Sequence, residues 1–284
     1  MHPDPQDVLF LGLGTGLTAA GAIPHQEVKR VTAVELIPEV VEAARELAEY
    51  NFNVVDHEKS RMVCDDGRHF LLATDEKFDV IVSDLFVPWE SESGYLYTVE
   101  HYEVSAARLK EGGLFCQWLP LYQVGEAEFE AIANSFSSVF PAVTLWWGKL
   151  AGSRGPVIAL VGKAGPVELD SEGTNRRIEQ LGRLMGVDPS IARADLVVDH
   201  FIGCWTVENA PEQVILNRDE YPIVEFSTPV SNRDRKLISG AVFEDYYQRV
   251  LAGLPMEQVT VDGRAVSNPE QRKKRQSLLL FGGR

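Results

Sequence analysis

Short apolar runs alternate with longer amphipathic segments through the first 163 residues of the chain. The runs are apolar at consecutive positions, which is typical of strands buried on both faces of a parallel sheet. They lie at residues 8–11, 31–34, 62–64, 80–82, 114–116, 143–146 and 157–161. The pattern predicts seven strands.

The segments between the runs have helical spacing. In residues 38–50, apolar side chains recur at three- and four-residue intervals, and Pro38 suits the first turn of a helix. Residues 98–109 and 126–139 show the same pattern. Alternating strands and helices predict an α/β fold with a mostly parallel sheet that is covered on both faces. Ligands of such sheets bind beyond the carboxyl ends of the strands, so the residues after each run are the candidates for chemistry.

A glycine-rich loop, Gly12-Leu13-Gly14-Thr15-Gly16, follows the first run. Glycine lets the backbone turn tightly and approach a ligand closely. The dinucleotide fingerprint has Gly or Ala one position later, where this chain has Leu17. A G-x-G-x-G loop instead suits the amino-acid portion and ribose of an S-adenosyl ligand. The structural alternative is that a strand-to-helix turn requires glycine in any case.

Acidic residues follow the second and third runs. Glu35 is placed to accept both hydroxyls of a ribose; alternatively, it stabilises the N-terminus of the helix that begins near Pro38. In Asp65-Asp66-Gly67-Arg68, Asp66 is placed to accept the amino group of adenine, while a neighbouring backbone N–H meets a ring nitrogen. The alternative is that Asp66 caps the helix expected at residues 68–73.

Asp84 follows the fourth run, where the reactive end of the ligand should lie. A carboxylate there can orient an amine and take its proton, or stabilise a nearby cation. Phe86, Pro88 and Trp89 are expected to form an apolar wall that excludes water. We interpret the polar residues 90–94 as an acidic lid over the site, with a solvated loop as the alternative.

The second part of the chain is less regular. Helices are expected at residues 175–185 and 235–251, and a strand followed by a turn at Pro229 is expected at 221–226. Residues 195–201 fit either a helix or a strand, and the tail after about residue 255 contains a possible docking patch at 278–281. We therefore divide the chain into an α/β domain at residues 1–163 and a C-terminal extension at 164–284. The extension is expected to be mostly helical and to pack on the first domain.

Composition narrows the function classes. The net charge of −15 over 284 residues disfavours binding to nucleic acid or to anionic lipid, and it would attract cations such as polyamines. Solubility alone is the alternative reading of that charge. The three cysteines are scattered, which indicates neither a disulfide framework nor a zinc site. No apolar run approaches the ~20 residues of a membrane helix, and the N-terminus does not read as a secretory signal, so we expect a cytoplasmic protein.

Taken together, these residues resemble the spermidine synthase family of polyamine aminopropyltransferases. The most specific likeness is the segment at 78–84, which ends in Asp84, followed by Leu96-Tyr97-Thr98-Val99-Glu100-His101-Tyr102, where the family has L-Y-T-x-E-F-Y. The other matching segments are residues 8–16, 34–35, 65–68, 109–117, 117–123 and 217–226. The last two resemble a bacterial subgroup that is often fused to membrane-transporter segments.

The resemblance implies a fold, a reaction and a set of site residues. The fold would be class I S-adenosylmethionine-dependent methyltransferase-like (Rossmann-like), with seven strands in a mostly parallel sheet. The co-substrate would be decarboxylated S-adenosylmethionine and the acceptor a di- or polyamine, with no metal and a possible homodimer. Asp84 would be the catalytic carboxylate and would also contact the amine, together with Tyr97 and Gln117. The residues expected to bind the nucleoside are Gly12, Gly14, Thr15, Gly16, Glu35, Asp66 and Gly67.

Three departures keep other functions open. The family usually has an acidic residue where this chain has Thr15, and a second aspartate where it has Val87. The family's N-terminal β-hairpin domain has no counterpart before residue 8. Losing the acid at Thr15 removes a charge that would repel the carboxylate of ordinary S-adenosylmethionine. The alternatives are therefore a small-molecule methyltransferase that uses S-adenosylmethionine and a non-catalytic module that binds a nucleoside or a polyamine.

Overall fold

The computed structural model describes residues 1–90, 92–148, 155–184, 194–207, 214–266 and 269–281. Two positions inside expected elements, Ser91 and Met185, lie outside the described residues. Within these ranges, no helix is both long enough and apolar enough to cross a bilayer.

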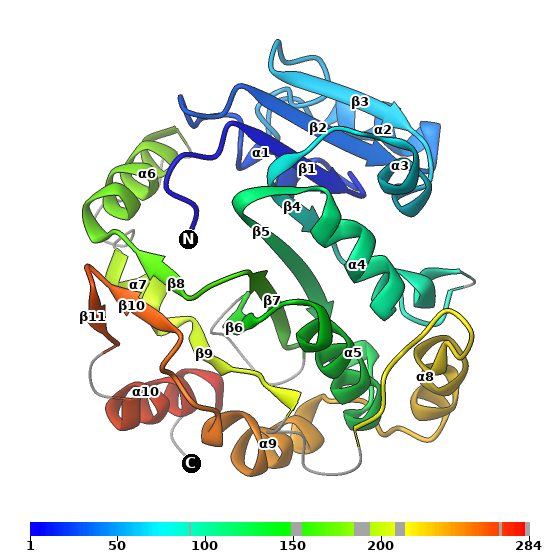
Figure 1. Ribbon diagram of the computed structural model, residues 1–284, viewed down its shortest axis with the longest axis vertical. Helices are drawn as coiled ribbons and strands as arrows, with labels where there is room; N and C mark the ends of the chain where they lie inside the picture. Colours follow the sequence, from blue (N-terminus) through cyan, green and yellow to red (C-terminus); the bar gives the residue numbers. More distant parts are fainter. Residues whose placement is uncertain (91, 149–154, 185–193, 208–213, 267–268, 282–284) are drawn as a thin grey trace.

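An eight-stranded sheet forms the centre of the molecule, in the order β3-β2-β1-β4-β5-β7-β6-β9 (Figure 1). The pairings from β3 to β5 are parallel, whereas β7 runs antiparallel to both β5 and β6. The seven expected strands, the mostly parallel pairing and the methyltransferase-like fold class are confirmed. The strands are β1 (Asp7–Leu11), β2 (Arg30–Glu35), β3 (Ser60–Cys64), β4 (Phe78–Ser83), β5 (Leu109–Pro120), β6 (Ala142–Trp147), β7 (Val157–Lys163) and β9 (Phe201–Cys204).

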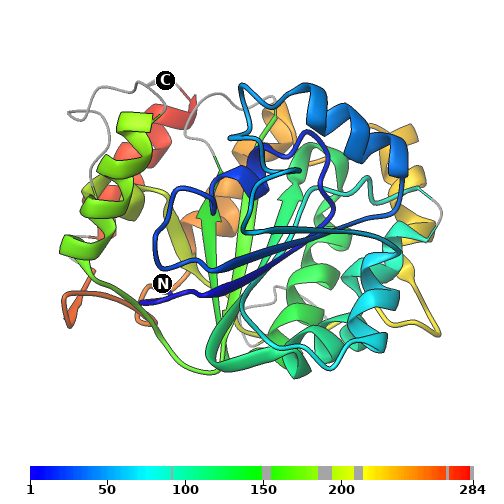
Figure 2. The same ribbon diagram turned by 90° about the horizontal axis from the view of Figure 1, so that it is seen from above.

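Helices cover both faces of this sheet, as the consecutive apolar residues predict. In β1, Leu9 and Leu11 pack into one hydrophobic cluster, while Val8 and Phe10 pack into another on the opposite face. The first cluster includes residues of α3 (Gly67–Ala73), α4 (Val99–Ala107) and α5 (Glu126–Val139), and the second includes residues of α1 (Leu17–Ala20) and α2 (Pro38–Glu46). Figure 2 shows the blue helices on one side of the sheet and the cyan and green helices on the other.

Residues after 163 contribute strands as well as helices. Strand β9 pairs with β6 and so extends the central sheet, and a small second sheet has the order β11-β10-β8. The boundary expected at residue 163 stays a prediction. The remaining elements are β8 (Val167–Leu169), α6 (Ser171–Leu184), α7 (Ala194–Asp199), α8 (Ile223–Arg233), α9 (Gly240–Arg249), β10 (Val259–Val261), β11 (Arg264–Ala265) and α10 (Pro269–Phe281), with the short 3-10 helices η1 (Ser93–Tyr97), η2 (Leu121–Gln123) and η4 (Leu251–Gly253).

The strand expected at residues 221–226 is wrong, because these residues enter helix α8, which also contains Pro229. The burial pattern explains the difference: Val224 and Thr228, four residues apart, are both fully buried, whereas Phe226 is 70% exposed. A period of four places one helical stripe against the core, and a strand would have buried Phe226 with Val224. The apolar run at 221–226 is too short for the sequence to distinguish the helical period from the two-residue period of a strand.

The C-terminal tail is a helix that docks on its own chain. Leu280 in α10 is buried, and the ring of Phe281 lies 5.4 Å from that of Phe243 and 5.3 Å from that of Tyr247, both in α9. The apolar residues at 278–281 therefore partly pack within the chain, although Leu278 and Leu279 remain exposed.

Candidate active site

The glycine-rich loop joins β1 to α1 at the carboxyl edge of the sheet. Its three glycines have positive φ angles, and the N–H of Gly12 donates to the carbonyl of Val34 at 2.8 Å. A Cβ at Gly12 would lie 3.3 Å from the ring of Phe86, and one at Gly16 would lie 2.8 Å from the side chain of Val54. Both the backbone conformation and the close approach therefore require glycine at these positions.

Glu35 ends β2 directly beneath this loop. Its Oε2 accepts from the N–H groups of Leu13 at 2.9 Å and Gly14 at 3.4 Å, and its Oε1 accepts from the N–H of Ile37 at 3.1 Å. The carboxylate thus holds the loop in its turn. A carboxylate has about four lone-pair sites, so Glu35 retains acceptor capacity for ribose hydroxyls. The expected ribose role stays a prediction that this geometry supports.

A buried amide that the sequence reasoning missed fixes the other end of the loop. Asn51 is fully buried, and its Nδ2 donates to the carbonyl of Thr15 at 3.0 Å and to that of Ala44 in α2 at 2.7 Å. The Thr15 side chain itself is exposed. Nothing in the local pattern around Asn51 marks it, because its partners lie in two other segments.

Asp66 caps helix α3, as the structural alternative proposed. Its Oδ1 accepts from the N–H of His69 at 2.7 Å. The neighbouring Asp65 contacts the His69 ring at 2.9 Å, which lowers the pKa of Asp65 and raises that of His69 through their hydrogen bond. Asp66 is exposed at the edge of the sheet, next to the end of β2, so binding of adenine by Asp66 and Gly67 stays a prediction.

Asp84 lies immediately beyond β4 and opens into a cavity. Its N–H donates to the carbonyl of Leu11 at 3.1 Å, and its Oδ1 accepts from the N–H of Leu85 at 2.8 Å. The cavity, of about 290 Å³, is lined by Thr18, Asp84, Leu85, Trp118, Gly148 and Val157. Burial and the nearby Asp84 charge raise the pKa of the Cys116 thiol to about 12, so this neighbour is a neutral thiol. Asp84 is thus an ionisable side chain in the wall of a mostly apolar cavity.

Tyr97 and Gln117, the other expected amine contacts, are fully buried. The hydroxyl of Tyr97 donates to the carbonyl of Phe86 at 3.1 Å and so anchors the loop after Asp84, and burial raises the Tyr97 pKa. The Nε2 of Gln117 donates to the carbonyl of Trp118 at 3.1 Å, while its Oε1 has no hydrogen-bond partner. Neither side chain lines the Asp84 cavity, and their contact with substrate stays a prediction.

Segment 217–219, from the second part of the chain, clamps the loop that follows Asp84. Asp219 accepts from Nη1 of Arg68 at 2.8 Å and from the Thr98 hydroxyl at 2.7 Å. Burial alone would raise the pKa of Asp219, but these hydrogen bonds outweigh it and lower that pKa. Arg68 lies in the first turn of α3 and Thr98 caps α4, so one carboxylate connects two elements at the edge of the site.

Asn217 completes this clamp. It is fully buried, its Nδ2 donates to the carbonyl of Gly94 in η1 at 3.0 Å, and its backbone N–H donates to the Ser135 hydroxyl of α5 at 2.7 Å. Its own carbonyl accepts from the N–H of Val99 at 3.0 Å. The sequence marks this segment only through the family likeness, because its structural role depends on contacts with residues more than 80 positions away.

Replacing Asp219 with Asn is expected to lower the free energy of unfolding by about 2 kcal/mol, because the partly buried Arg68 guanidinium loses its charged partner. The matched control is Arg218→Gln, which removes the exposed ion pair to Glu100 at 3.2 Å. That change should cost no more than about 1 kcal/mol. Urea unfolding of the three proteins measures both values, and equal losses for the two variants would contradict the clamp.

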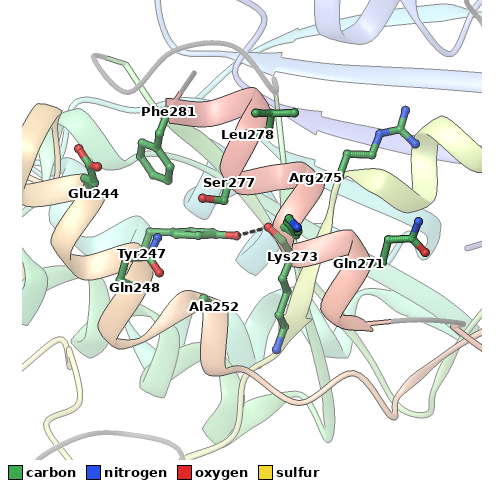
Figure 3. Close-up of a pocket in the computed structure, with 11 residues that line it drawn as sticks. Glu244, Tyr247, Gln248, Ala252, Gln271, Lys273, Arg275, Ser277, Leu278 and Phe281 are labelled. Carbon is green, nitrogen blue, oxygen red and sulfur yellow. Dashed lines mark hydrogen bonds between the residues drawn. The ribbon is translucent and has the colours of Figure 1, made fainter. Parts of the chain in front are cut away.

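A second, larger cavity of about 660 Å³ lies between α9 and α10 (Figure 3). Its lining includes Lys273, Lys274 and Arg275 and one carboxylate, Glu244. The hydroxyl of Tyr247 donates to the carbonyl of Lys273 at 3.3 Å across it. The charged residues of the lining are three basic side chains and one acidic one, a balance that repels ammonium groups, so we assign no amine chemistry to this cavity.

No group of three or more His, Cys, Asp or Glu side chains within the described ranges is arranged to hold a metal ion.

Comparison with known proteins places the chain in a family. Residues 1–149, about half of the chain, match the family model of the spermine/spermidine synthase domain. The polyamine aminopropyltransferase of Sulfurisphaera tokodaii is 32% identical over 190 residues, which cover 62% of this chain and 60% of that protein. The polyamine aminopropyltransferase of Thermotoga petrophila is 30% identical over 150 residues, which cover 52% of this chain and 50% of that protein. The one of Serratia proteamaculans is 40% identical over 116 residues, which cover 40% of this chain and 40% of that protein.

The matched part of the chain spans 60% or less of the length of these relatives. Among solved structures, a spermidine synthase in complex with the transition-state analogue AdoDATO has a TM-score of 0.47 at 20% identity, covering 81% of this chain and 68% of that one. Human methyltransferase-like protein 13 in complex with SAH has a TM-score of 0.49 at 17% identity, and the match covers 66% of this chain and 87% of that one. On the match of the family model, the chain belongs to the spermine/spermidine synthase family.

Proposed function

We propose that this protein transfers an aminopropyl group from decarboxylated S-adenosylmethionine to an amine of the di- or polyamine class. The observation that carries the proposal is the placement of Asp84, a carboxylate in the wall of a mostly apolar cavity beside the glycine-rich loop that Glu35 supports. The relatives named polyamine aminopropyltransferases support the choice of acceptor. The homodimer that the resemblance implies stays a prediction.

In this reaction the acceptor nitrogen attacks the carbon next to the sulfonium. The carbon–nitrogen bond forms, the carbon–sulfur bond breaks with its electron pair going to sulfur, and methylthioadenosine leaves. The acceptor loses one proton, and Asp84 is the group placed to orient the amine and take that proton. Because the sulfonium is already a good leaving group, holding nitrogen and carbon in line contributes most of the rate enhancement.

Methyl transfer from ordinary S-adenosylmethionine is the second candidate, and one observation favours it. The exposed Thr15 occupies the position where the family usually has an acid, so the loop carries no charge that would repel a substrate carboxylate. The same Gly loop and Glu35 would serve either nucleoside. The two candidates therefore differ in one testable property, the preference for a carboxylated or a decarboxylated ligand.

Calorimetric titration with decarboxylated S-adenosylmethionine, S-adenosylmethionine and methylthioadenosine tests the proposal. Tighter binding of the decarboxylated form, followed by release of methylthioadenosine when an amine is added, is the expected result. Tighter binding of S-adenosylmethionine, with transfer of a methyl group and no methylthioadenosine, would support the second candidate. Failure of all three ligands to bind would overturn both.

A further inference from the structure

A turn that follows helix α2 holds the second half of the glycine-rich loop, while Glu35 holds the first half. Glu35 accepts from the N–H groups at residues 13 and 14, whereas Nδ2 of Asn51 donates to the carbonyl of Thr15 at 3.0 Å. The same Nδ2 donates to the carbonyl of Ala44 in α2 at 2.7 Å, so both N–H groups of the amide are used. Asn51 thus ties the loop to helix α2.

The turn also contacts the backbone of the loop directly. A Cβ at Gly16 would lie 2.8 Å from Cγ1 of Val54 and 3.0 Å from Nδ2 of Asn51, and both of these side chains are fully buried. The N–H of Gly16 donates to the carbonyl of Leu13 at 2.8 Å. The peptide that joins Thr15 to Gly16 therefore has its carbonyl held by Asn51 and its N–H held by Leu13, which fixes its orientation.

This arrangement costs free energy in two places. Phe52 and Asn53, directly after Asn51, have φ angles of 53° and 52°, a left-handed conformation that is unfavourable for most residues with a Cβ. The buried Oδ1 of Asn51 has no hydrogen-bond partner among the described residues, which is also unfavourable. Costs of this kind are concentrated where a structure serves binding or catalysis, so they point to a functional role for the contact with the loop.

We infer that Asn51 is a positioning residue for the nucleoside co-substrate, and that it keeps the glycine-rich loop in its binding shape before the ligand arrives. The inference rests on the proposed function and adds to it a residue outside the strand-end loops. Because Asn51 is fully buried, it acts through the carbonyl of Thr15 and not by contact with the ligand. A loop that is already ordered loses less conformational entropy on binding, so the affinity for the nucleoside is higher.

Replacing Asn51 with Leu removes both N–H donors at nearly constant size. We expect the Kd for methylthioadenosine to rise about tenfold, because binding must then order the backbone at Thr15. The KM for decarboxylated S-adenosylmethionine should rise by the same factor, while kcat at saturation and the KM for the amine stay within about threefold. A merely structural role would instead reduce the fraction of active protein, which lowers kcat and leaves the KM for the nucleoside unchanged.

The matched control is Asn53→Gly, in the same turn. It removes an exposed amide, and glycine adopts the left-handed backbone at this position readily, so the Kd should stay within about threefold. Asn51→Ser is the second variant in case Asn51→Leu does not fold; its single hydroxyl donor cannot serve both carbonyls, so the Kd should rise about three- to tenfold. An unchanged Kd in either folded Asn51 variant, or an equal rise in Asn53→Gly, would overturn the inference.

Hydrogen exchange of the backbone amides at residues 12–16 measures the loop without any ligand. Several of these N–H groups are hydrogen-bonded, to Val34, Glu35 and Leu13. We expect their exchange to become faster in Asn51→Leu and to stay unchanged in Asn53→Gly. Equal exchange in Asn51→Leu and the original protein would show that Asn51 does not hold the loop, and would overturn the inference.

Failure of the proposed function is distinguished from failure of the inference by the binding measurement, which needs no amine. If the original protein binds methylthioadenosine but no amine is a substrate, the transfer reaction is wrong, and the affinities of the Asn51 variants still decide the role of Asn51. If transfer occurs and the Asn51 variants bind as tightly as the original protein, the inference alone is overturned. Absence of nucleoside binding to the original protein overturns both.

Discussion

Replacing Asp84 with Asn is expected to lower kcat for amine transfer by about 10²–10⁴-fold, the usual contribution of a positioned general base. Asparagine keeps the side-chain oxygen that accepts from the N–H of Leu85, so the loop geometry should survive. The charge that orients the ammonium and the group that takes its proton are both lost. Initial rates of methylthioadenosine release, measured with saturating nucleoside and amine, give the effect.

The control for this substitution is Asp75→Asn. Asp75 is fully exposed, and its replacement removes the same unit of negative charge from a chain whose net charge is −15. Its kcat should be unchanged, and the affinity of both variants for methylthioadenosine should stay within about threefold of the original. If Asp84→Asn retained full activity, Asp84 would have no catalytic role.

Replacing Glu35 with Ala is expected to weaken methylthioadenosine binding by at least about 100-fold, because two hydrogen bonds from ribose hydroxyls to a carboxylate are lost. The substitution also removes the acceptor for the N–H groups of Leu13 and Gly14, which releases the glycine-rich loop from its turn. Both effects act on the nucleoside rather than on the amine. Titration calorimetry with methylthioadenosine measures the loss.

Two further variants separate the role of the Glu35 side chain from that of acidic charge near helix α2. Glu35→Gln keeps one oxygen for the loop and should bind the nucleoside more tightly than Glu35→Ala. Glu39→Ala removes an exposed acid from the first turn of α2 and should leave the affinity unchanged. Equal affinities for Glu35→Ala and the original protein would disprove the ribose assignment.

Much of the fold was readable from local pattern. The apolar runs in β1, β2, β6 and β7 became strands that are buried at consecutive positions, and such burial requires apolar side chains on both faces. The run at 62–64 lies in β3 at the edge of the sheet and is only partly covered. Helix α5 matches the expected bounds because its apolar positions repeat over fourteen residues, long enough to establish a helical period. The strand predicted at 221–226 was wrong because so short an apolar run fits both the two-residue period of a strand and the period of a helix.

The residues of the candidate site also fall into those that the sequence predicts and those that only the tertiary structure decides. Its glycine loop, Glu35 and Asp84 follow strands along the chain, and the carboxyl ends of neighbouring parallel strands meet in space, so sequence order was sufficient to bring them together. The choice between Gln117 and Trp118 was different. It depended on which face of β5 each side chain takes, and that is fixed by pairing with β4 and β7.

The sequence by itself therefore determined seven of the eight strands of the central sheet, the order of the strand-end loops and the carboxylates that those loops carry. Tertiary structure alone decided that Asp219 holds Arg68 from 151 residues away and that Trp118 forms a wall of the cavity. The physical reason is the distance along the chain over which each kind of interaction acts. Hydrophobic periodicity records how one element meets the core, whereas a clamp or a cavity wall exists only once separate elements have packed and their register is set.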